Sequence, residues 1–163
     1  IHPFLDGNGR LGRILIALIA IKEDLVDVPV FFVSEELEKE RARYYDFLNG
    51  VRGDNPDWYA WIKFFITACA RMTDTLLSKL KAAEDLALKG LKLCTLESEK
   101  NIWLYTFSDP YTTAARVAEN LSMSPATARK GLRALSDAGL LYADESTIRN
   151  RKYRNYDLMR ILD

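Results

Sequence analysis

Near the start of the chain, a short segment that disfavours both helix and strand stands directly before a strongly apolar segment. Gly7-Asn8-Gly9 is a poor segment for helix or strand, because glycine loses the most backbone freedom on folding. Residues 10–22 are almost all apolar and are long enough for about three helical turns. We therefore predict a Gly-Asn-Gly turn that leads into a helix. Residues 13–21 are apolar on every face, which predicts that this helix is buried all round.

The same turn carries the residue types of an anion-binding site. The first N–H groups of a helix have no partner within the helix and lie at the positive end of its dipole. Arg10 and Arg13 share a helix face, so both can reach one anion. Asp6 offers the carboxylate that Mg²⁺ prefers beside phosphate oxygens. His2, the only histidine, can act as a general base near neutral pH. The pattern indicates a polyphosphate site with a metal ion.

Residues 2–13 read His-Pro-Phe-Leu-Asp-Gly-Asn-Gly-Arg-Leu-Gly-Arg. This segment resembles the signature of the Fic family at every fixed position. Members of that family mostly move AMP from ATP to a hydroxyl of a target protein. The resemblance implies that His2 deprotonates the target hydroxyl and that Asp6 holds Mg²⁺ on the phosphates. It also implies that the other motif residues bind the nucleotide: Phe4, Gly7, Asn8, Gly9, Arg10 and Arg13.

Within this resemblance Gly7, Asn8 and Gly9 cradle the α- and β-phosphates, and the two arginines clamp the phosphate tail. The Doc branch of the family, which phosphorylates its targets, carries lysine at the position of Gly9. Gly9 therefore favours nucleotidyl transfer. In Fic proteins a paired tyrosine at this distance after the motif lies by the nucleotide base. Tyr44-Tyr45 matches the pair, and we expect Tyr45 at the adenine, with packing of both rings in the core as the alternative. Glu40 stands where family members often carry asparagine.

Two further helices are predicted after the motif. Residues 28–33 form a short extended connection broken by Pro29, after which Ser34 caps a helix that ends near residue 50 or 52. Asn55 and Pro56 then have the residue types of an N-cap and a first helical position.

One long helical pattern covers residues 57–93, with breaks near Thr73 or Gly90 left open. Its second half is more charged and indicates a connector helix. Its apolar stripe is more typical of a core than of a cofactor site. The stripe consists of Trp58, Trp61, Ile62, Phe65, Ile66 and Cys69.

Shorter elements follow from about Thr95. The predicted elements are a helix ending before Asp109, a helix from Thr112 to Asn120, a helix from Ser124 to Ala138 closed by Gly139, and strands over 140–143 and 152–156 joined by a polar loop. This order resembles a winged helix-turn-helix. Between residues 122 and 154, seven basic against three acidic residues give a net charge of +4. The basic residues are Arg129, Lys130 and Arg133 on the helix, and Arg149, Arg151, Lys152 and Arg154 on the hairpin.

That charge excess has three interpretations: DNA binding through the winged helix, a solvated face, or a wing used for dimer or target contacts. The whole chain has a net charge of zero, so no global field selects nucleic acid or membrane. No apolar run reaches transmembrane length, and we expect no membrane partner. Cys69 and Cys94 are far apart, which predicts buried free thiols and fits a reducing cytoplasm.

The expected fold is mainly α. Residues 1–94 are predicted to be the C-terminal half of an all-α Fic core with its connector helix, and residues 95–163 a winged helix-turn-helix domain with a small β-hairpin. Because the motif begins at the second residue, we expect the chain to be the C-terminal part of a longer protein and incomplete as an enzyme by itself. The isolated chain is then expected to copurify with the part before it or to form a homodimer through the helix after the motif.

The expected activity is that of an adenylyltransferase that depends on ATP and Mg²⁺ and modifies a Ser, Thr or Tyr hydroxyl of a target protein. The alternative is a DNA-binding regulator in which the Fic part is vestigial.

Overall fold

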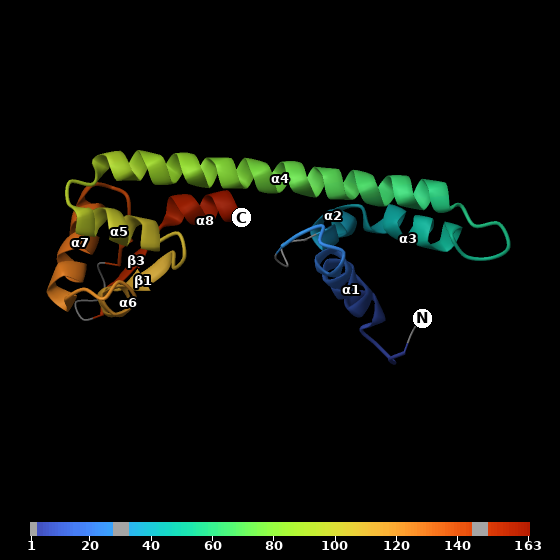
Figure 1. Ribbon diagram of the computed structural model, residues 1–163, viewed down its shortest axis with the longest axis horizontal. Helices are drawn as coiled ribbons and strands as arrows, with labels where there is room; N and C mark the ends of the chain where they lie inside the picture. The colour runs from blue at the N-terminus through green and yellow to red at the C-terminus, as the bar shows by residue number, and fades with distance from the viewer. Residues whose placement is uncertain (1–2, 28–32, 145–149) are drawn as a thin grey trace. The chain divides into compact units, whose positions relative to one another are not determined.

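The chain is mainly α-helical, as predicted. The structure, a computed structural model, describes residues 3–27, 33–144 and 150–163, and 69% of it is helical. The described residues form eight helices and one three-stranded antiparallel sheet (Figure 1). They group into two compact units, the N-terminal unit Ile1–Leu76 and the C-terminal unit Leu77–Asp163. The domain ranges 1–94 and 95–163 stay a prediction.

The N-terminal unit consists of helices packed on the first half of a long helix. Its helices are α1 (Asn8–Lys22), α2 (Val33–Lys39), α3 (Arg41–Gly50) and the start of α4 (Trp58–Leu93). The core contains five buried side chains, Val33, Leu37, Phe64, Ala68 and Met72. Leu37 of α2 and Phe64 of α4 are therefore buried in one apolar cluster, which holds the short helix against the long one.

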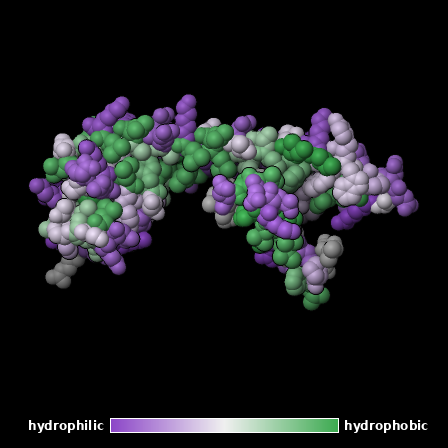
Figure 2. Space-filling view, viewed as in Figure 1, coloured by the Kyte–Doolittle hydropathy of each residue, from purple (hydrophilic) through white to green (hydrophobic). Residues whose placement is uncertain are grey.

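Helix α1 differs from its prediction in two ways. It begins at Asn8 rather than after Gly9, so only Gly7 remains as the turn residue before it. The prediction that it is buried all round is wrong, since Ala20 is its only buried residue. Its exposed apolar side chains are Ile14, Leu15, Leu18 and Ile19. Hydrophobic side chains accordingly reach the surface over α1 (Figure 2).

The single helix predicted from Ser34 is two helices. Val33 is already helical, so Ser34 is not the N-cap, and the backbone breaks at Glu40 before α3 begins. Residues 28–32 of the predicted extended connection lie outside the described residues. The break matters for the site below, because it lets α3 take a direction of its own.

Helix α4 runs without a break for 36 residues, which excludes the interruptions left open near Thr73 and Gly90. It begins later than predicted, and Asp57 is its capping residue: the Asp57 carboxylate accepts a hydrogen bond from the Ala60 N–H at 3.0 Å. The predicted apolar stripe is partly wrong. Trp61, Phe65 and Cys69 pack on the core, but three members of the stripe are exposed: Trp58, Ile62 and Ile66.

The C-terminal unit combines the end of α4 with short helices around a small sheet. Its further elements are α5 (Glu97–Tyr105), β1 (Tyr111–Thr113), α6 (Ala114–Asn120), α7 (Pro125–Asp137), β2 (Tyr142–Ala143), β3 (Lys152–Arg154) and α8 (Tyr156–Leu162). The strand order is β1-β3-β2, and both pairs are antiparallel. Residues 145–149 of the predicted polar loop lie outside the described residues.

Most boundaries of this unit follow local signals. Ser124 caps α7 and Pro125 is its first residue, as predicted, and Gly139 has the positive φ expected after a helix end. The cap of α6 is Thr113 rather than Thr112: both residues belong to β1, and it is the Thr113 hydroxyl that accepts from the Arg116 N–H. Strand β1 and helix α8 were not predicted. Residue 156, assigned to the second strand, is the first residue of α8.

Both cysteines are free, as predicted, but they are half-buried rather than fully buried. Partial burial raises the pKa of the Cys69 and Cys94 thiols. Among the helices of the described residues, none combines the length and apolar character needed to cross a membrane.

Trp103 anchors α5 to the end of α4. Its side chain is fully buried, and its indole Nε1–H donates to the Ala87 carbonyl oxygen at 2.9 Å. The ring occupies the space beside Gly90: a Cβ added at Gly90 would lie 2.2 Å from the ring atom Cε2. Only glycine permits this close approach of helix and ring.

Gly90→Ala is therefore expected to destabilise the C-terminal unit. Overpacking a core in this way costs about 1–3 kcal/mol. Chemical denaturation followed by circular dichroism measures the loss. Gly12→Ala is the matched control, because a Cβ at Gly12 meets nothing within 4 Å, so its stability should be unchanged or slightly higher. A Gly90→Ala protein as stable as wild type would contradict the packing described.

Candidate functional site

The N-terminus of α1 is built around Gly7. Gly7 is the N-cap residue and has φ +82°, a left-handed conformation that glycine adopts without strain. Among the residues that the structure describes, no side chain accepts a hydrogen bond as the cap of this helix. The first N–H groups of α1 are therefore available to an anion, and the helix dipole favours a negative charge there.

Asn8 fixes the loop that precedes the helix. Its side-chain amide donates to the Phe4 carbonyl oxygen at 2.6 Å, and its Oδ1 accepts from the Phe4 N–H at 3.1 Å. Both bonds close the chain from residue 4 to residue 8 into a compact turn. The Asn8 side chain thus holds the loop, which leaves its backbone for contact with a ligand. The Phe4 side chain is exposed.

Asp6 lies at the open side of this loop. Its Oδ1 accepts from the Gly7 N–H at 2.6 Å, and its Oδ2 lies 3.5 Å from an Arg10 amino group. The carboxylate is 95% exposed. In the part of the chain that the structure describes, no three His, Cys, Asp or Glu residues gather as a metal site. A lone exposed carboxylate nevertheless fits Mg²⁺, which often takes only one or two protein carboxylates and completes its shell with phosphate and water.

The two motif arginines lie beside the glycines of the loop. A Cβ added at Gly7 would be 3.7 Å from an Arg10 amino nitrogen, and one added at Gly9 would be 3.6 Å from an Arg13 amino nitrogen. The structure thus brings both guanidinium groups to the same few backbone atoms. These residues fit a polyphosphate because the uncapped N–H groups and the two cations meet at one place.

A cleft of about 760 Å³ opens between this loop and α3. The lining residues are Leu5, Asp6, Gly7, Asn8, Gly9, Arg10, Arg13, Glu38, Arg41, Tyr44, Tyr45, Leu48, Asn49 and Arg52. Four of them are arginines and two are acids, so the lining has an excess of positive charge. A cleft of this size and charge suits an anionic ligand of nucleotide size.

The two tyrosines of α3 differ in their surroundings. Tyr44 packs against Trp61 with ring centroids 5.7 Å apart and contacts the core. Tyr45 is 48% exposed, and the Arg41 guanidinium lies 5.9 Å from its ring centroid. Of the pair, Tyr45 offers the more open aromatic face in the cleft, while Tyr44 supports it from behind at 5.4 Å.

Of the predicted site residues, seven line one cleft: Asp6, Gly7, Asn8, Gly9, Arg10, Arg13 and Tyr45. Phe4 adjoins it through Asn8, and His2 lies outside the described residues. Sequence reasoning did not assign Glu38, Arg41, Asn49 and Arg52 to the cleft. A signal existed in the helical spacing of Arg41, Tyr45, Asn49 and Arg52, which puts them on one side of the chain.

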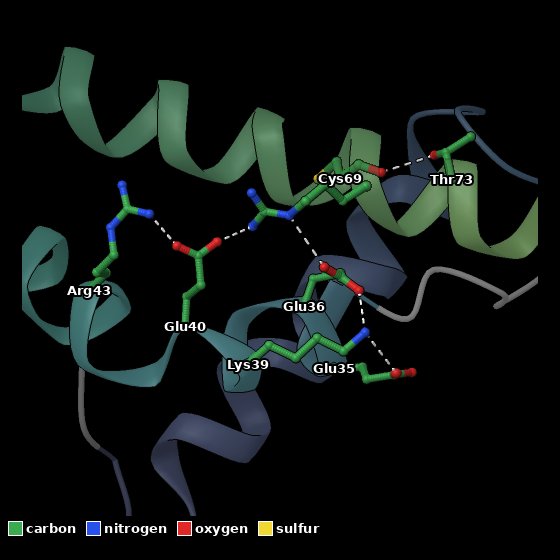
Figure 3. A network of polar contacts seen from close by, with 8 residues as sticks. Glu35, Glu36, Lys39, Glu40, Arg43, Cys69 and Thr73 are labelled. Atoms are coloured by element: carbon green, nitrogen blue, oxygen red, sulfur yellow. Dashed lines mark hydrogen bonds and ion pairs between the residues drawn. The ribbon is translucent and has the colours of Figure 1, made fainter. Parts of the chain in front are cut away.

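An ion network joins α2, the break at Glu40 and α4 (Figure 3). Arg71 of α4 reaches Glu36, with Nε 3.4 Å from Oε2, and also pairs with Glu40. Glu36 in turn binds Lys39 at 2.6 Å, and Glu40 binds Arg43. The hydrogen bond from Lys39, together with Arg71, lowers the pKa of the buried Glu36 carboxyl.

A second groove, also of about 760 Å³, lies in the C-terminal unit. Its lining includes Arg129 and Arg133 from α7, Arg151 before β3, and the acidic Glu119. Lys130 lines a separate small pocket near Glu99 instead. Arg154 is directed to the sheet, where its two amino groups donate to the Tyr111 and Tyr156 hydroxyls at 2.7 and 2.9 Å.

The predicted basic set is therefore divided. Only part of it faces the groove, Arg154 has a structural role in the sheet, and Arg149 lies outside the described residues.

Comparison with known proteins supports a relationship over part of the chain. No family model matches the chain. The chain is similar to the protein adenylyltransferase Fic of Nematostella vectensis, with 32% identity over 78 residues, or 48% of this chain. The matched part of the chain spans 16% of the length of that protein. The similarity therefore suggests the Fic family and an adenylyltransferase at the level of the family.

Proposed function

We propose that the chain carries the nucleotide-binding part of a protein adenylyltransferase. The observation that carries this proposal is the meeting of the uncapped α1 N-terminus, Arg10 and Arg13 at one end of a cleft whose other wall presents Tyr45. One end of the cleft suits a polyphosphate and the other suits an aromatic base. The partial similarity to a Fic adenylyltransferase supports the same reading.

The proposed reaction joins a target hydroxyl to the α-phosphorus of ATP. The new bond forms between the hydroxyl oxygen and that phosphorus, and the bond to the bridging oxygen breaks, so pyrophosphate leaves. His2 takes the hydroxyl proton. The α1 N–H groups, Arg10 and Arg13 oppose the charge on the phosphates, so positioning and electrostatics supply most of the rate enhancement.

Asp6 is the residue that would hold Mg²⁺, and the ion when bound neutralises phosphate charge. Gly9 supports transfer of the nucleotidyl group. This rests on the resemblance, since the phosphorylating Doc branch carries lysine at that position; a Cβ at Gly9 would meet the Arg13 guanidinium only at an ordinary contact distance of 3.6 Å. Asn8 acts through the loop: its two hydrogen bonds to Phe4 hold the cradle in shape.

Arg13→Ala is expected to weaken binding of ATP more than binding of AMP, because the second arginine meets the distal phosphates in this assignment. A charge-assisted contact is worth about 1.5–3 kcal/mol, so the ATP affinity should fall by roughly tenfold or more. Isothermal titration calorimetry with Mg²⁺ present measures both ligands. Lys22→Ala, which removes a cation from the other end of α1, is the matched control. Equal losses for ATP and AMP would argue that Arg13 is only structural.

His2→Ala is expected to abolish AMP transfer while leaving ATP affinity largely intact, because the general base acts in the chemical step. The loss should be about a hundredfold or more. Transfer is measured as labelling of protein by ATP labelled in the α-phosphate. Labelling by the His2→Ala protein at the wild-type rate would exclude the assigned role.

DNA binding by the C-terminal unit is a second candidate function. The order of α6, α7 and the β2–β3 hairpin resembles that of a winged helix-turn-helix and supports this candidate, as do Arg129, Arg133 and Arg151 in the lining of the groove. Exposed arginines one turn apart on α7 are suited to phosphate contacts.

The double variant Arg129→Ala/Arg133→Ala is therefore expected to weaken binding to a DNA duplex. The slope of the logarithm of affinity against the logarithm of salt concentration should become shallower by the amount that about two phosphate contacts contribute. Fluorescence anisotropy at several salt concentrations measures both. Arg160→Ala, an exposed arginine of α8 in the same unit, is the control. An unchanged salt slope in the double variant would remove this candidate.

A further inference from the structure

Helix α3 forms one wall of the cleft, and none of its residues is fully buried. It meets α4 from one side through two half-buried aromatic rings: Tyr44 lies 5.7 Å from Trp61, and Phe47 lies 4.9 Å from Phe64. The other side presents Arg41 and Tyr45 to the cleft. The rotation of α3 about its own axis therefore decides where Tyr45 points.

Ion pairs add to this packing at the start of α3. Glu40 lies at the break between α2 and α3, and its two carboxylate oxygens accept from different helices: Oε1 from Arg71 of α4 and Oε2 from Arg43 of α3. Arg71 also holds Glu36 of α2. The side chains alternate in sign along the chain of contacts (Figure 3), in the order Glu35, Lys39, Glu36, Arg71, Glu40 and Arg43.

The network is partly shielded from water. The Glu36 and Glu40 side chains are 8% and 23% exposed, so their contacts with Arg71 are screened less than those of surface pairs. Glu36 keeps Lys39 as a second partner at 2.6 Å. Loss of the Arg71 charge therefore does not leave Glu36 as an isolated buried charge, and the unit should remain folded. Glu40, by contrast, would lose its contact with α4.

We propose that Arg71 is a positioning residue for base recognition: by holding Glu40 it sets the rotation of α3 and thereby aims Tyr45 into the cleft. This inference rests on the proposed function. In this proposal the two ends of the cleft depend on different contacts. The phosphate end is held by the hydrogen bonds between Phe4 and Asn8, and the base end by the contact between Arg71 and Glu40. Removing the second contact should affect only ligands that carry a base.

Two variants of the full 163-residue chain test this division. Arg71→Met keeps the aliphatic stem and removes the charge, and Glu40→Gln keeps the size of the side chain while Arg71 retains Glu36. Each variant is expected to weaken ATP binding about five- to tenfold. Without the contact between Arg71 and Glu40, α3 has to become ordered when the adenine base binds, and this ordering reduces the binding free energy. Binding of inorganic tripolyphosphate, which has no base, should change less than about twofold. Calorimetry with Mg²⁺ measures both ligands, and circular dichroism confirms folding.

The double variant gives a second readout. Since both changes remove one contact, Arg71→Met/Glu40→Gln should bind ATP no more than about twofold more weakly than either single variant. Lys63→Met is the matched control, because Lys63 is an exposed residue of the same helix, and it should leave both affinities unchanged.

The inference would be overturned if the variants lost equal affinity for ATP and tripolyphosphate, or lost affinity for neither. In that case, ATP binding by the wild-type chain would still support the proposed function. Wild-type protein that binds neither ligand would overturn both.

Discussion

Packing onto α4 is the constraint on which both units depend. A helix of 36 residues is long for a globular chain, and most helix stability in proteins comes from the packing of an apolar face. In the N-terminal unit, Phe64, Ala68 and Met72 supply that face to Val33 and Leu37. In the C-terminal unit, Leu86 and Leu91 pack on the cluster around Trp103, where Gly90 leaves room for the indole. The short helices of each unit are stable because α4 covers their apolar sides.

Elements with a strong local signal could be predicted from the sequence. Ser124-Pro125 and Gly139 define α7 at both ends, since cap chemistry is decided by a few neighbouring residues. Where several capping residues stand close together, local chemistry does not choose between them. Asp57 caps α4 rather than Asn55, and Thr113 rather than Thr112 caps α6 although both threonines pair with β3 in the sheet.

The exposed face of α1 shows a second limit of sequence patterns. Hydrophobic periodicity identifies a helix and its apolar sides, but it does not state which of those sides meets a neighbour. Residues 13–21 predict burial all round, and the structure buries only Ala20 among them. The same holds for Trp58, Ile62 and Ile66 on α4, which share the apolar pattern and are nevertheless exposed. Burial depends on the assembled packing and not on composition.

The two ends of the cleft differ in how far they could be predicted, and the reason is physical. The end proposed to bind phosphates is local: residues 4–13 form the loop, the helix start and both arginines, so its residues are adjacent in the sequence. The end proposed to bind the base is tertiary. Tyr45 lies on α3, which begins after the break at Glu40, and Glu40 is contacted by Arg71, 31 residues further along the chain. In the proposed assignment, the sequence motif specifies how phosphates are held, whereas recognition of the base depends on contacts that only the folded chain creates.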